Sequence, residues 1–212
     1  MNIAIVASEC VPFAKAGGLA DVVGALPKSL HHQGCDVKVF LPKHDTIDEA
    51  KHELHFEYDI GEMQVRVAGI AWPVHVLRSN IPGSDVPVYF IDCPHFFQRG
   101  KIYTNDLDEG ERFVLFSKAA IETLQRLQWA PDVMHCNDWQ TGLLPLLLRD
   151  NYGWDKLFDG TATLYAIHNI GYQGLFTTSL LGSAEVHPDR FDALKMHDGV
   201  AMMKGVFSFP KS

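Results

Sequence analysis

The strongest indication of the fold is the segment Lys15-Ala16-Gly17-Gly18-Leu19-Ala20-Asp21, because it separates an apolar run from an amphipathic segment. The run before it, Asn2–Ser8, is typical of a strand that is buried on both faces. A strand, a glycine loop and a helix in this order direct backbone N–H groups and the positive end of a helix dipole to one point. Such a point is a natural seat for phosphate, and Lys15 adds a positive charge at its mouth.

The two glycines also fit a plain tight turn, in which they only supply positive φ angles. The loop by itself leaves both interpretations open. The chain has no Gly-x-x-x-x-Gly-Lys-Ser/Thr motif, which argues against a P-loop nucleotide triphosphatase. The spacing of Gly17, Gly18 and Gly24 does not match Gly-x-Gly-x-x-Gly, which disfavours an NAD- or FAD-binding oxidoreductase.

The composition indicates a soluble cytoplasmic α/β domain. Among the 212 residues, no apolar run is long enough to cross a membrane, and the N-terminus lacks the features of a signal peptide. The net charge of −8 disfavours a nucleic-acid-binding protein. The cysteines lie far apart and the histidines are dispersed, so we expect free thiols and no metal site. The four cysteines are Cys10, Cys35, Cys93 and Cys136.

Strand-like and helix-like segments alternate along the chain, which predicts a doubly wound, mainly parallel, Rossmann-like sheet. The expected strands are Asn2–Ser8, Asp36–Pro42, Val86–Asp92, Asp132–Cys136 and Thr161–Ile167. The expected helices start near Leu19, span about Glu111–Leu127 and span Thr141–Asp150, with Pro27 requiring a kink or a new helix.

A segment at about residues 53–78 interrupts this alternation. Glu53–Ile60, Met63–Trp72 and Pro73–Arg78 look like antiparallel strands, with a hairpin turn at Gly61-Glu62. We expect a small antiparallel β insertion that packs beside the main sheet and does not line the cleft.

Three polar clusters follow three of the expected strands, and ligands bind at the carboxyl ends of strands in such sheets. The clusters are Ser8–Asp21, His135–Gly142 and Ile167–Gly174. Each has a plain structural interpretation: Asn137 or Asp138 as a helix N-cap, or a loop held by side-chain hydrogen bonds. Their coincidence at one edge favours a binding site.

These motifs resemble those of the bacterial glycogen synthase and plant starch synthase family. The matching segments are Lys15–Pro27, Glu111–Ala120, His135–Leu143 and His168–Gly174, and the likeness runs from Met1 to about Gly205. It implies the N-terminal half of a retaining glucosyltransferase with two Rossmann-like domains, the GT-B fold. Such enzymes transfer glucose from ADP-glucose, or sometimes UDP-glucose, to the non-reducing end of an α-1,4-glucan.

The resemblance also implies roles for individual residues. Lys15 would contact the donor phosphates, Gly17 and Gly18 would let the backbone approach them, and no cofactor would be needed. His168 and Asn169 would border the reacting glucosyl unit, and Asp21 and Asp138 would contact sugar hydroxyls. The expected contacts on the sugar and acceptor side are Tyr103, Trp139, Gln140, Tyr172 and Gln173.

The sequence departs from the family pattern in two places. The family's Lys-Thr-Gly-Gly has Ala16 in place of the threonine, and residues 206–212 form a divergent tail after a domain at 1–205. We therefore expect the second GT-B domain to be absent and a separate C-terminal half to be a possible partner. The main alternative function is a non-catalytic module that binds glucan or a nucleotide sugar.

Overall fold

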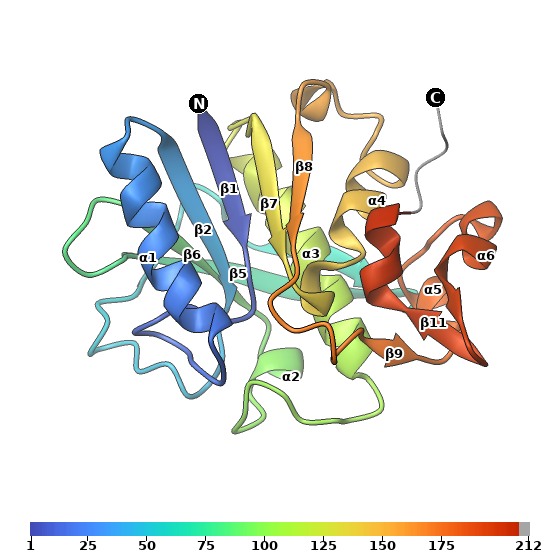
Figure 1. Cartoon of the computed structure of the whole chain (residues 1–212). Coiled ribbons are helices and arrows are strands. Elements are labelled where there is room, and N and C mark those ends of the chain that lie inside the picture. Colours follow the sequence, from blue (N-terminus) through green and yellow to red (C-terminus); the bar gives the residue numbers. More distant parts are fainter. Residues whose placement is uncertain (208–212) are drawn as a thin grey trace.

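The computed structural model describes residues 1–207, and within them eight strands form one sheet in the order β3-β5-β6-β2-β1-β7-β8, with β4 paired to β5 (Figure 1). The pairs β6–β2, β2–β1, β1–β7 and β7–β8 are parallel. The sheet strands are β1 (Asn2–Val6), β2 (Asp36–Pro42), β3 (His55–Phe56), β4 (Met63–Val67), β5 (Ile70–Asn80), β6 (Pro87–Asp92), β7 (Val133–Asn137) and β8 (Ala162–Ala166). The prediction of a doubly wound, mainly parallel sheet is confirmed.

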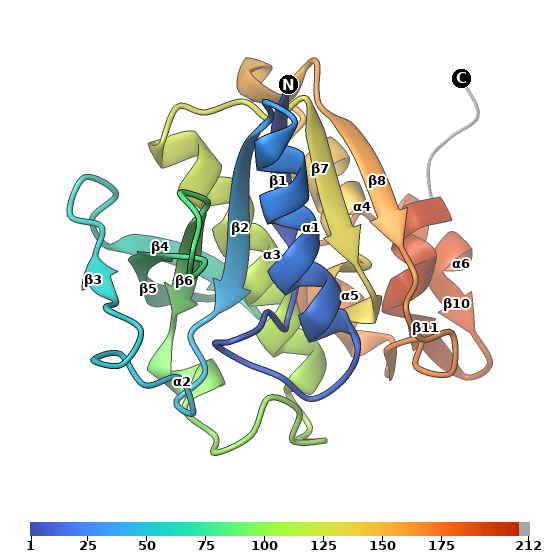
Figure 2. The same ribbon diagram turned by 60° about the vertical axis from the view of Figure 1, so that its left-hand side comes forward.

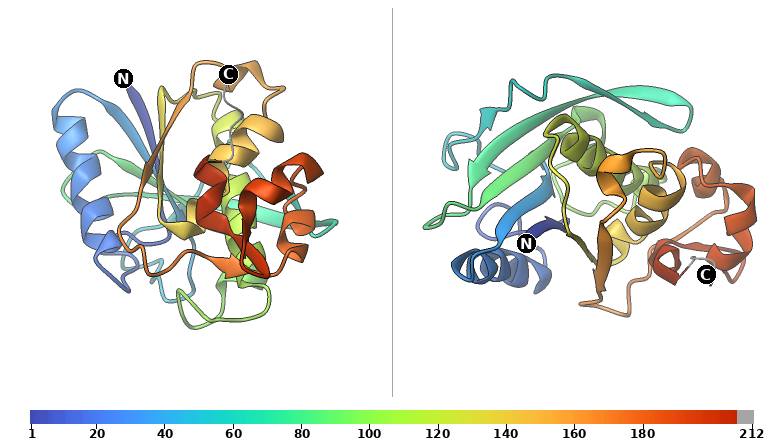
Figure 3. Two further views of the ribbon diagram at one scale, coloured as in Figure 1. Left: turned by 45° about the vertical axis from the view of Figure 1, so that its right-hand side comes forward. Right: turned by 90° about the horizontal axis from the view of Figure 1, so that it is seen from above.

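Hydrophobic cores lie on both faces of this sheet, as alternating side chains of β1 show. Ile3 and Ile5 face the core under α1, whereas Ala4 and Val6 face the core under α3 and α4. Figure 3 shows the helices on the two sides of the sheet. The long helices are α1 (Leu19–His32), α3 (Glu109–Arg126) and α4 (Leu144–Asp150). Burial on both faces explains why the central strand β1 is almost continuously apolar.

Helix α1 is one helix that continues through the buried Pro27, so the prediction of a new helix there is wrong. Gly34, with φ +86°, follows it in the left-handed conformation that commonly ends helices. The helix predicted from Thr141 also differs. A short 3-10 turn, η1 (Trp139–Thr141), comes first, and α4 begins only at Leu144 with Pro145 in its first turn.

The segment at 53–78 is antiparallel, as predicted, but two details differ. The tight turn of the β4–β5 hairpin is at Ala68-Gly69, both with positive φ, and not at Gly61-Glu62. In addition, residues 75–80 of β5 pair with β6, so the insertion extends the main sheet and does not pack beside it (Figure 2). The alternation predicted for Met63–Val67 is confirmed, since its residues are alternately buried and exposed.

The region after β8 contains short elements that the sequence did not predict. They are β9 (Leu175–Phe176), α5 (Ser179–Ser183), η3 (Pro188–Arg190), α6 (Phe191–Leu194), β10 (Lys195–Met196), β11 (Gly199–Ala201) and η4 (Met202–Phe207). The strands β9, β11 and β10 make a small antiparallel sheet. Two further short helices are α2 (Pro94–Phe97) and η2 (Lys156–Phe158). Of the tail predicted at 206–212, Val206 and Phe207 end η4, and 208–212 lie outside the described residues.

Candidate functional site

The carboxyl ends of β1, β7 and β8 lie at one edge of the sheet, because these three strands are parallel neighbours. The glycine loop with Lys15 and Asp21 follows β1, Asp138 follows β7, and His168 follows β8. The lower edge in Figure 2 is this edge. The expected convergence of the polar clusters is therefore confirmed as an arrangement, while the role of each residue stays a prediction.

Lys15 makes an exposed ion pair with Asp21 at the mouth of the glycine loop. Its Nζ lies 2.7 and 2.8 Å from the two carboxylate oxygens. The loop amides are also occupied, since Glu9 Oε2 accepts hydrogen bonds from the N–H groups of Ala16 at 2.6 Å and Gly17 at 2.7 Å. The buried carboxylate of Glu9 thus occupies the position that the sequence analysis assigned to phosphate. The backbone N–H groups that remain for a ligand are those at the start of α1, where no side chain caps the helix.

The two glycines do not serve a tight turn. Gly18 has φ −71°, and Gly17 is likewise outside the left-handed region. A Cβ added at Gly18 would meet no atom within 4 Å, and one added at Gly17 would lie 4.0 Å from Glu9 Oε1. The fold therefore needs glycine at neither position, and the plain interpretation of the loop is wrong. The feature of this loop that still favours a ligand is the open space beside the backbone of the two glycines.

Tyr103 connects the glycine loop to the rest of the edge. Its hydroxyl donates to Glu9 Oε1 at 2.6 Å and lies 2.8 Å from Ser8 Oγ. Burial, and then the negative charge of Glu9, raise the pKa of Tyr103 well above its usual range. The hydroxyl is therefore a fixed proton donor, and the tyrosine holds Glu9 in the position that binds the loop amides.

Asp138 ties β7 to the loop after β8. Its Oδ1 accepts hydrogen bonds from the backbone N–H groups of His168 at 2.7 Å and Asn169 at 3.2 Å. Asp138 is almost completely buried, and its φ of 54° with ψ −177° is a rare conformation for a residue other than glycine. The structure thus gives Asp138 a clear part in positioning His168 and Asn169.

The His168 ring has a defined hydrogen-bond partner, the buried Asn137. Asn137 Nδ2 donates to the carbonyls of Val6 and His135, so its Oδ1 faces the ring, 2.9 Å from His168 Nε2. An amide oxygen only accepts hydrogen bonds, so Nε2 carries a proton and the neutral ring has its acceptor at Nδ1. Asn137 was named in the sequence only as a possible helix cap.

The residues expected on the sugar side have different surroundings. Trp139 is half-buried and packs edge-to-face on Phe113, with ring centroids 5.1 Å apart, and against Phe176. Gln140 is buried, and its Oε1 has no hydrogen-bond partner in the described part of the chain. Tyr172 is 68% exposed. Gln173 donates through Nε2 to the carbonyl of Ile170 at 3.4 Å. Among the aromatic residues expected on the sugar side, Tyr172 is the one whose ring is largely exposed.

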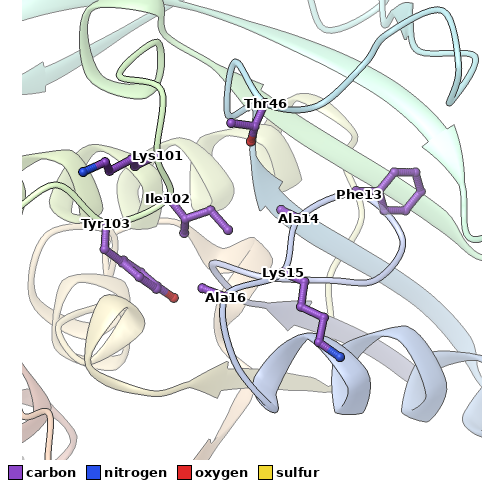
Figure 4. Close-up of a pocket in the computed structure, with 8 residues that line it drawn as sticks. All are labelled: Phe13, Ala14, Lys15, Ala16, Thr46, Lys101, Ile102 and Tyr103. Carbon is purple, nitrogen blue, oxygen red and sulfur yellow. The ribbon is translucent and has the colours of Figure 1, made fainter.

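A pocket of about 450 Å³ opens between the glycine loop, the loop after β2 and the loop before α3 (Figure 4). Tyr103 points its hydroxyl toward the glycine loop, whereas the Lys15 side chain extends toward α1. The residues that line the pocket are Phe13, Ala14, Lys15, Ala16, Thr46, Lys101, Ile102 and Tyr103. Of the predicted site residues, it includes Lys15 and Tyr103. Asp138 and His168 do not line it, so a cleft shared by Lys15, Asp138 and His168 stays a prediction.

Glu9, Asn137 and Arg112 are functional candidates that sequence reasoning missed. Arg112 is completely buried, and it donates to the carbonyls of Phe96 at 2.7 Å and Ile102 at 3.2 Å. It thereby fixes the loop that carries Tyr103. The position of Glu9 at the end of a strand, beside a loop rich in free N–H groups, was a signal in the sequence that could have been used.

The family model for the starch synthase catalytic domain matches residues 2–210 of this chain. The chain belongs to this family. Glycogen synthase from Streptococcus mutans is 42% identical over 183 residues, which make up 86% of this chain and 37% of the relative. Glycogen synthase from Geobacillus thermodenitrificans is 39% identical over 97% of this chain and 42% of its own length.

Among solved structures, the catalytic domain of starch synthase IV from Arabidopsis thaliana, bound to ADP and acarbose, is similar to this chain with a TM-score of 0.85 and 33% identity. The similarity covers 98% of this chain and 43% of that domain. The chain thus spans about two fifths of the length of its family relatives. No helix within residues 1–207 is long and apolar enough to cross a membrane.

Proposed function

We propose that this chain is the half of a cytoplasmic α-glucan synthase that binds the glucosyl unit and the glucan acceptor. The enzyme transfers glucose from ADP-glucose, or UDP-glucose, to the non-reducing end of an α-1,4-glucan. The glycine loop carries the proposal, because its backbone conformation does not require Gly17 or Gly18 while an open space lies beside them. The relatives named glycogen synthase and the ADP-bound starch synthase structure support it.

Charge stabilisation of the departing nucleotide is the main contribution of Lys15 in this proposal. Lys15 and the uncapped start of α1 attract phosphate, and Lys15 exchanges its ion pair with Asp21 for one with the donor. This exchange leaves the Asp21 carboxylate free to accept a sugar hydroxyl. The reaction then needs no resident cofactor, since the positive charge comes from the chain itself.

The residues after β7 and β8 orient the glucosyl unit. Asp138 fixes the backbone of His168 and Asn169, and Asn137 fixes the His168 ring with its proton on Nε2. A ring held in this way presents one defined hydrogen-bonding atom, Nδ1, to a ligand. Pre-organised polar groups at this edge distinguish the hydroxyls of a bound sugar at little reorganisation cost.

The remaining part of the relatives supplies the nucleotide pocket in this proposal, as a C-terminal GT-B half. Transfer requires both halves to close around the donor, which orients the reacting atoms and excludes water. We expect the 212-residue chain to fold and to incorporate no labelled glucose into glycogen at a synthase-like rate. Robust incorporation, free of contaminating synthase, would show that all essential groups lie within this chain.

A non-catalytic module that binds glucan or a nucleotide sugar is the second candidate function. It requires only the pre-organised polar groups at the sheet edge, where Asp138 and Asn137 hold the loop and ring of His168. The two candidates differ when the chain is mixed with a separately expressed C-terminal half of a relative. Glucose transfer by the mixture supports the synthase, whereas ligand binding without transfer supports the module.

Lys15→Ala tests the phosphate contact by titration of the chain with ADP-glucose. Hydrogen bonds to charged groups contribute about 1.5–3 kcal/mol, and the lost pair with Asp21 offsets part of this, so we expect roughly tenfold weaker binding. Lys15→Arg keeps the charge and is expected to bind within a few-fold of the wild type. Lys51→Ala, at an exposed lysine outside the site, is the matched control. Equal affinity for ADP-glucose in the wild type and Lys15→Ala would remove Lys15 from the site.

A further inference from the structure

The carboxylate of Glu9 is buried beside the glycine loop with no cation to neutralise it. Glu9 is 4% exposed, and among residues 1–207 it forms no ion pair with a lysine, arginine or histidine. Its charge is held by three hydrogen bonds, from the N–H groups of Ala16 and Gly17 and from the Tyr103 hydroxyl. A buried charge without a counter-ion costs free energy, so stability alone does not favour a glutamate at this position. The residue therefore requires a functional explanation.

Glu9 fixes the chain at the point where it enters α1. One carboxylate oxygen, Oε2, accepts hydrogen bonds from both the Ala16 N–H at 2.6 Å and the Gly17 N–H at 2.7 Å. The helix starts directly after these residues, and no side chain caps its first turn at Gly18. The free N–H groups at a helix start point along the helix axis, so their direction depends on how the preceding residues are held. The two bonds to Glu9 thus set the direction in which the start of α1 meets a ligand.

Tyr103 links this arrangement to the pocket. Its ring belongs to the pocket wall, and its hydroxyl points toward the glycine loop (Figure 4). The hydroxyl donates to the other oxygen of Glu9, Oε1, at 2.6 Å, and it lies 2.8 Å from Ser8 Oγ. Tyr103 comes from the loop before α3, so the contact joins two loops across 94 positions of the chain. One side chain therefore borders the space for a ligand with its ring and holds the glycine loop with its hydroxyl.

We propose that Glu9 and Tyr103 are positioning residues for the donor, because together they hold the glycine loop so that the N–H groups at the start of α1 face the donor phosphates. This inference rests on the proposed function, in which these N–H groups and Lys15 receive the phosphates. A loop that is held in its binding conformation before the ligand arrives loses less freedom on binding. Tyr103 acts through Glu9, so the loss of its hydroxyl weakens donor binding although its ring lies on the acceptor side.

The shape of the Glu9 side chain, and not its charge, carries this role. Glutamine has the same shape, and its amide oxygen accepts the hydrogen bonds of Ala16 and Gly17 equally well. Its NH2 group then faces the Tyr103 hydroxyl, which accepts one hydrogen bond and donates its hydrogen to Ser8 Oγ. Alanine removes both sides of the contact. A carboxylate that only competed with phosphate for the amides would instead give stronger phosphate binding in both variants.

Titration of the 212-residue chain with ADP-glucose and with maltotriose tests the proposal. We expect Glu9→Ala to bind ADP-glucose roughly tenfold more weakly, and Glu9→Gln to recover most of this loss. Tyr103→Phe keeps the ring, so its affinity for ADP-glucose should fall roughly fivefold and by clearly more than its affinity for maltotriose. Tyr152→Phe is the matched control, because it removes a tyrosine–glutamate hydrogen bond of 2.7 Å to Glu122, outside the pocket. This control is expected to bind both ligands as the wild type does.

Amide hydrogen exchange in the free chain reports on the loop without any ligand. The amides of Ala16 and Gly17 are expected to exchange several-fold faster in Glu9→Ala and Tyr103→Phe than in the wild type and Tyr152→Phe. This readout also separates the two proposals. A wild-type chain that binds no ADP-glucose counts against the synthase function, whereas unchanged exchange in both variants overturns the loop contact itself.

The binding results contradict the inference in three cases. The first is wild-type affinity for ADP-glucose in a folded Glu9→Ala variant, or in Tyr103→Phe where Glu9→Ala does not fold. The second is an equal loss of ADP-glucose and maltotriose affinity in Tyr103→Phe, which would indicate a general loosening of this edge. The third is stronger ADP-glucose binding by both Glu9→Ala and Glu9→Gln, which would make Glu9 a competitor of the phosphates.

Discussion

Asp138 shows, at the scale of a single residue, how the site combines strain with satisfied hydrogen bonds. The residue adopts a left-handed φ of 54° and uses one carboxylate oxygen to hold two backbone N–H groups of the next loop. With ψ at −177°, this conformation is one that residues other than glycine seldom adopt. The acceptor role of the carboxylate therefore outweighs the backbone preference for glycine at this position.

Substitution of Asp138 separates these two constraints. Asp138→Ala removes the acceptor and places a Cβ-only side chain at positive φ, so we expect a loss of about 1–3 kcal/mol in the free energy of unfolding. Asp138→Asn keeps an oxygen acceptor and leaves the backbone strain unchanged, so a loss below about 1 kcal/mol is expected. Urea unfolding measures both. Identical stability of Asp138→Ala and wild type would mean that water satisfies the two amides as well as the carboxylate does.

Among the structural elements, the loop at 98–108 is held by two arginines, one completely buried and one more exposed. Arg112 is completely buried and reaches the loop through the Ile102 carbonyl and Thr104 Oγ1, and the buried Glu109 accepts from the Thr104 N–H. Arg99 forms a more exposed, forked pair with Asp108 at 2.7 and 2.6 Å. Tyr103 lies between these anchors.

Arg112→Met is expected to lower the free energy of unfolding by about 3–5 kcal/mol, because Glu109 and two carbonyls lose their buried partner. Arg99→Met, which breaks the more exposed pair, is expected to cost roughly 1 kcal/mol. Urea unfolding and amide exchange over 99–106 measure the two variants. If both variants cost the same, the loop would be held by its surface pairs and not by the buried arginine.

Gly142 marks a close approach between η1 and η4. A Cβ at this position would lie 2.4 Å from the Met202 carbonyl oxygen, and Gly205 approaches the Gly142 carbonyl in turn. Gly142→Ala must therefore push η4 away, and overpacking of this kind costs typically 1–3 kcal/mol. Gly160→Ala, where an added Cβ meets nothing within 4 Å and φ is not positive, is the control. Thermal unfolding compares the two, and equal melting temperatures would show that η4 shifts without cost.

The sequence predicted the parallel strands well because a strand that is buried on both faces leaves a continuous apolar run, as in Asp36–Pro42. It failed where an element is too short to show a period, as in β9 with two residues and β11 with three. The hairpin turn was predicted at Gly61-Glu62 because a glycine between two strand-like runs is a turn signal. Gly61 does have positive φ, yet the strand pairing closes at Ala68-Gly69.

The candidate site, like the fold, could be predicted from the sequence only in part. The edge of the sheet was predictable, since strand order and parallel direction fix which residues meet. The partners of individual polar groups could not be predicted. The Glu9 carboxylate accepts hydrogen bonds from the loop amides, and Asp21 forms an ion pair with Lys15. Such pairings depend on side-chain positions that no spacing in the sequence encodes.

For the whole molecule, His44 links stability to pH. It is completely buried, with Nε2 3.2 Å from the Ser8 carbonyl oxygen, and its Nδ1 has no hydrogen-bond partner in the part of the chain that the structure describes. Burial lowers the pKa of His44 to about 4. The hydrogen bond with the Ser8 carbonyl and the charge of Asp45 oppose this shift, whereas Arg112 and Lys43 add to it. The folded protein therefore keeps this ring neutral at a pH where an unfolded chain protonates it.

Stability from His44 is present above the unfolded pKa of about 6.5 and is lost as pH falls toward 4, because the unfolded state then binds the additional proton. Between pH 7 and pH 4.5 the expected loss is roughly 2–3 kcal/mol. His44→Gln lacks this contribution, so its free energy of unfolding should fall less over the same interval. Urea unfolding at both pH values tests this, and parallel losses in the two proteins would exclude His44 as the source.

The central strand has its two partners at very different distances along the chain. β1 pairs with β2 at residues 36–40 and with β7 at residues 133–136, and the Asn2 N–H reaches the Asp132 carboxylate across 130 positions. During synthesis at the ribosome, one side of β1 therefore stays bare until β7 has been made. At about 5–20 residues per second, this delay is on the order of ten seconds. The apolar strand β1 thus needs protection by chaperones over this interval, and a premature stop codon before Val133 would release a product that aggregates through the unpaired side of β1.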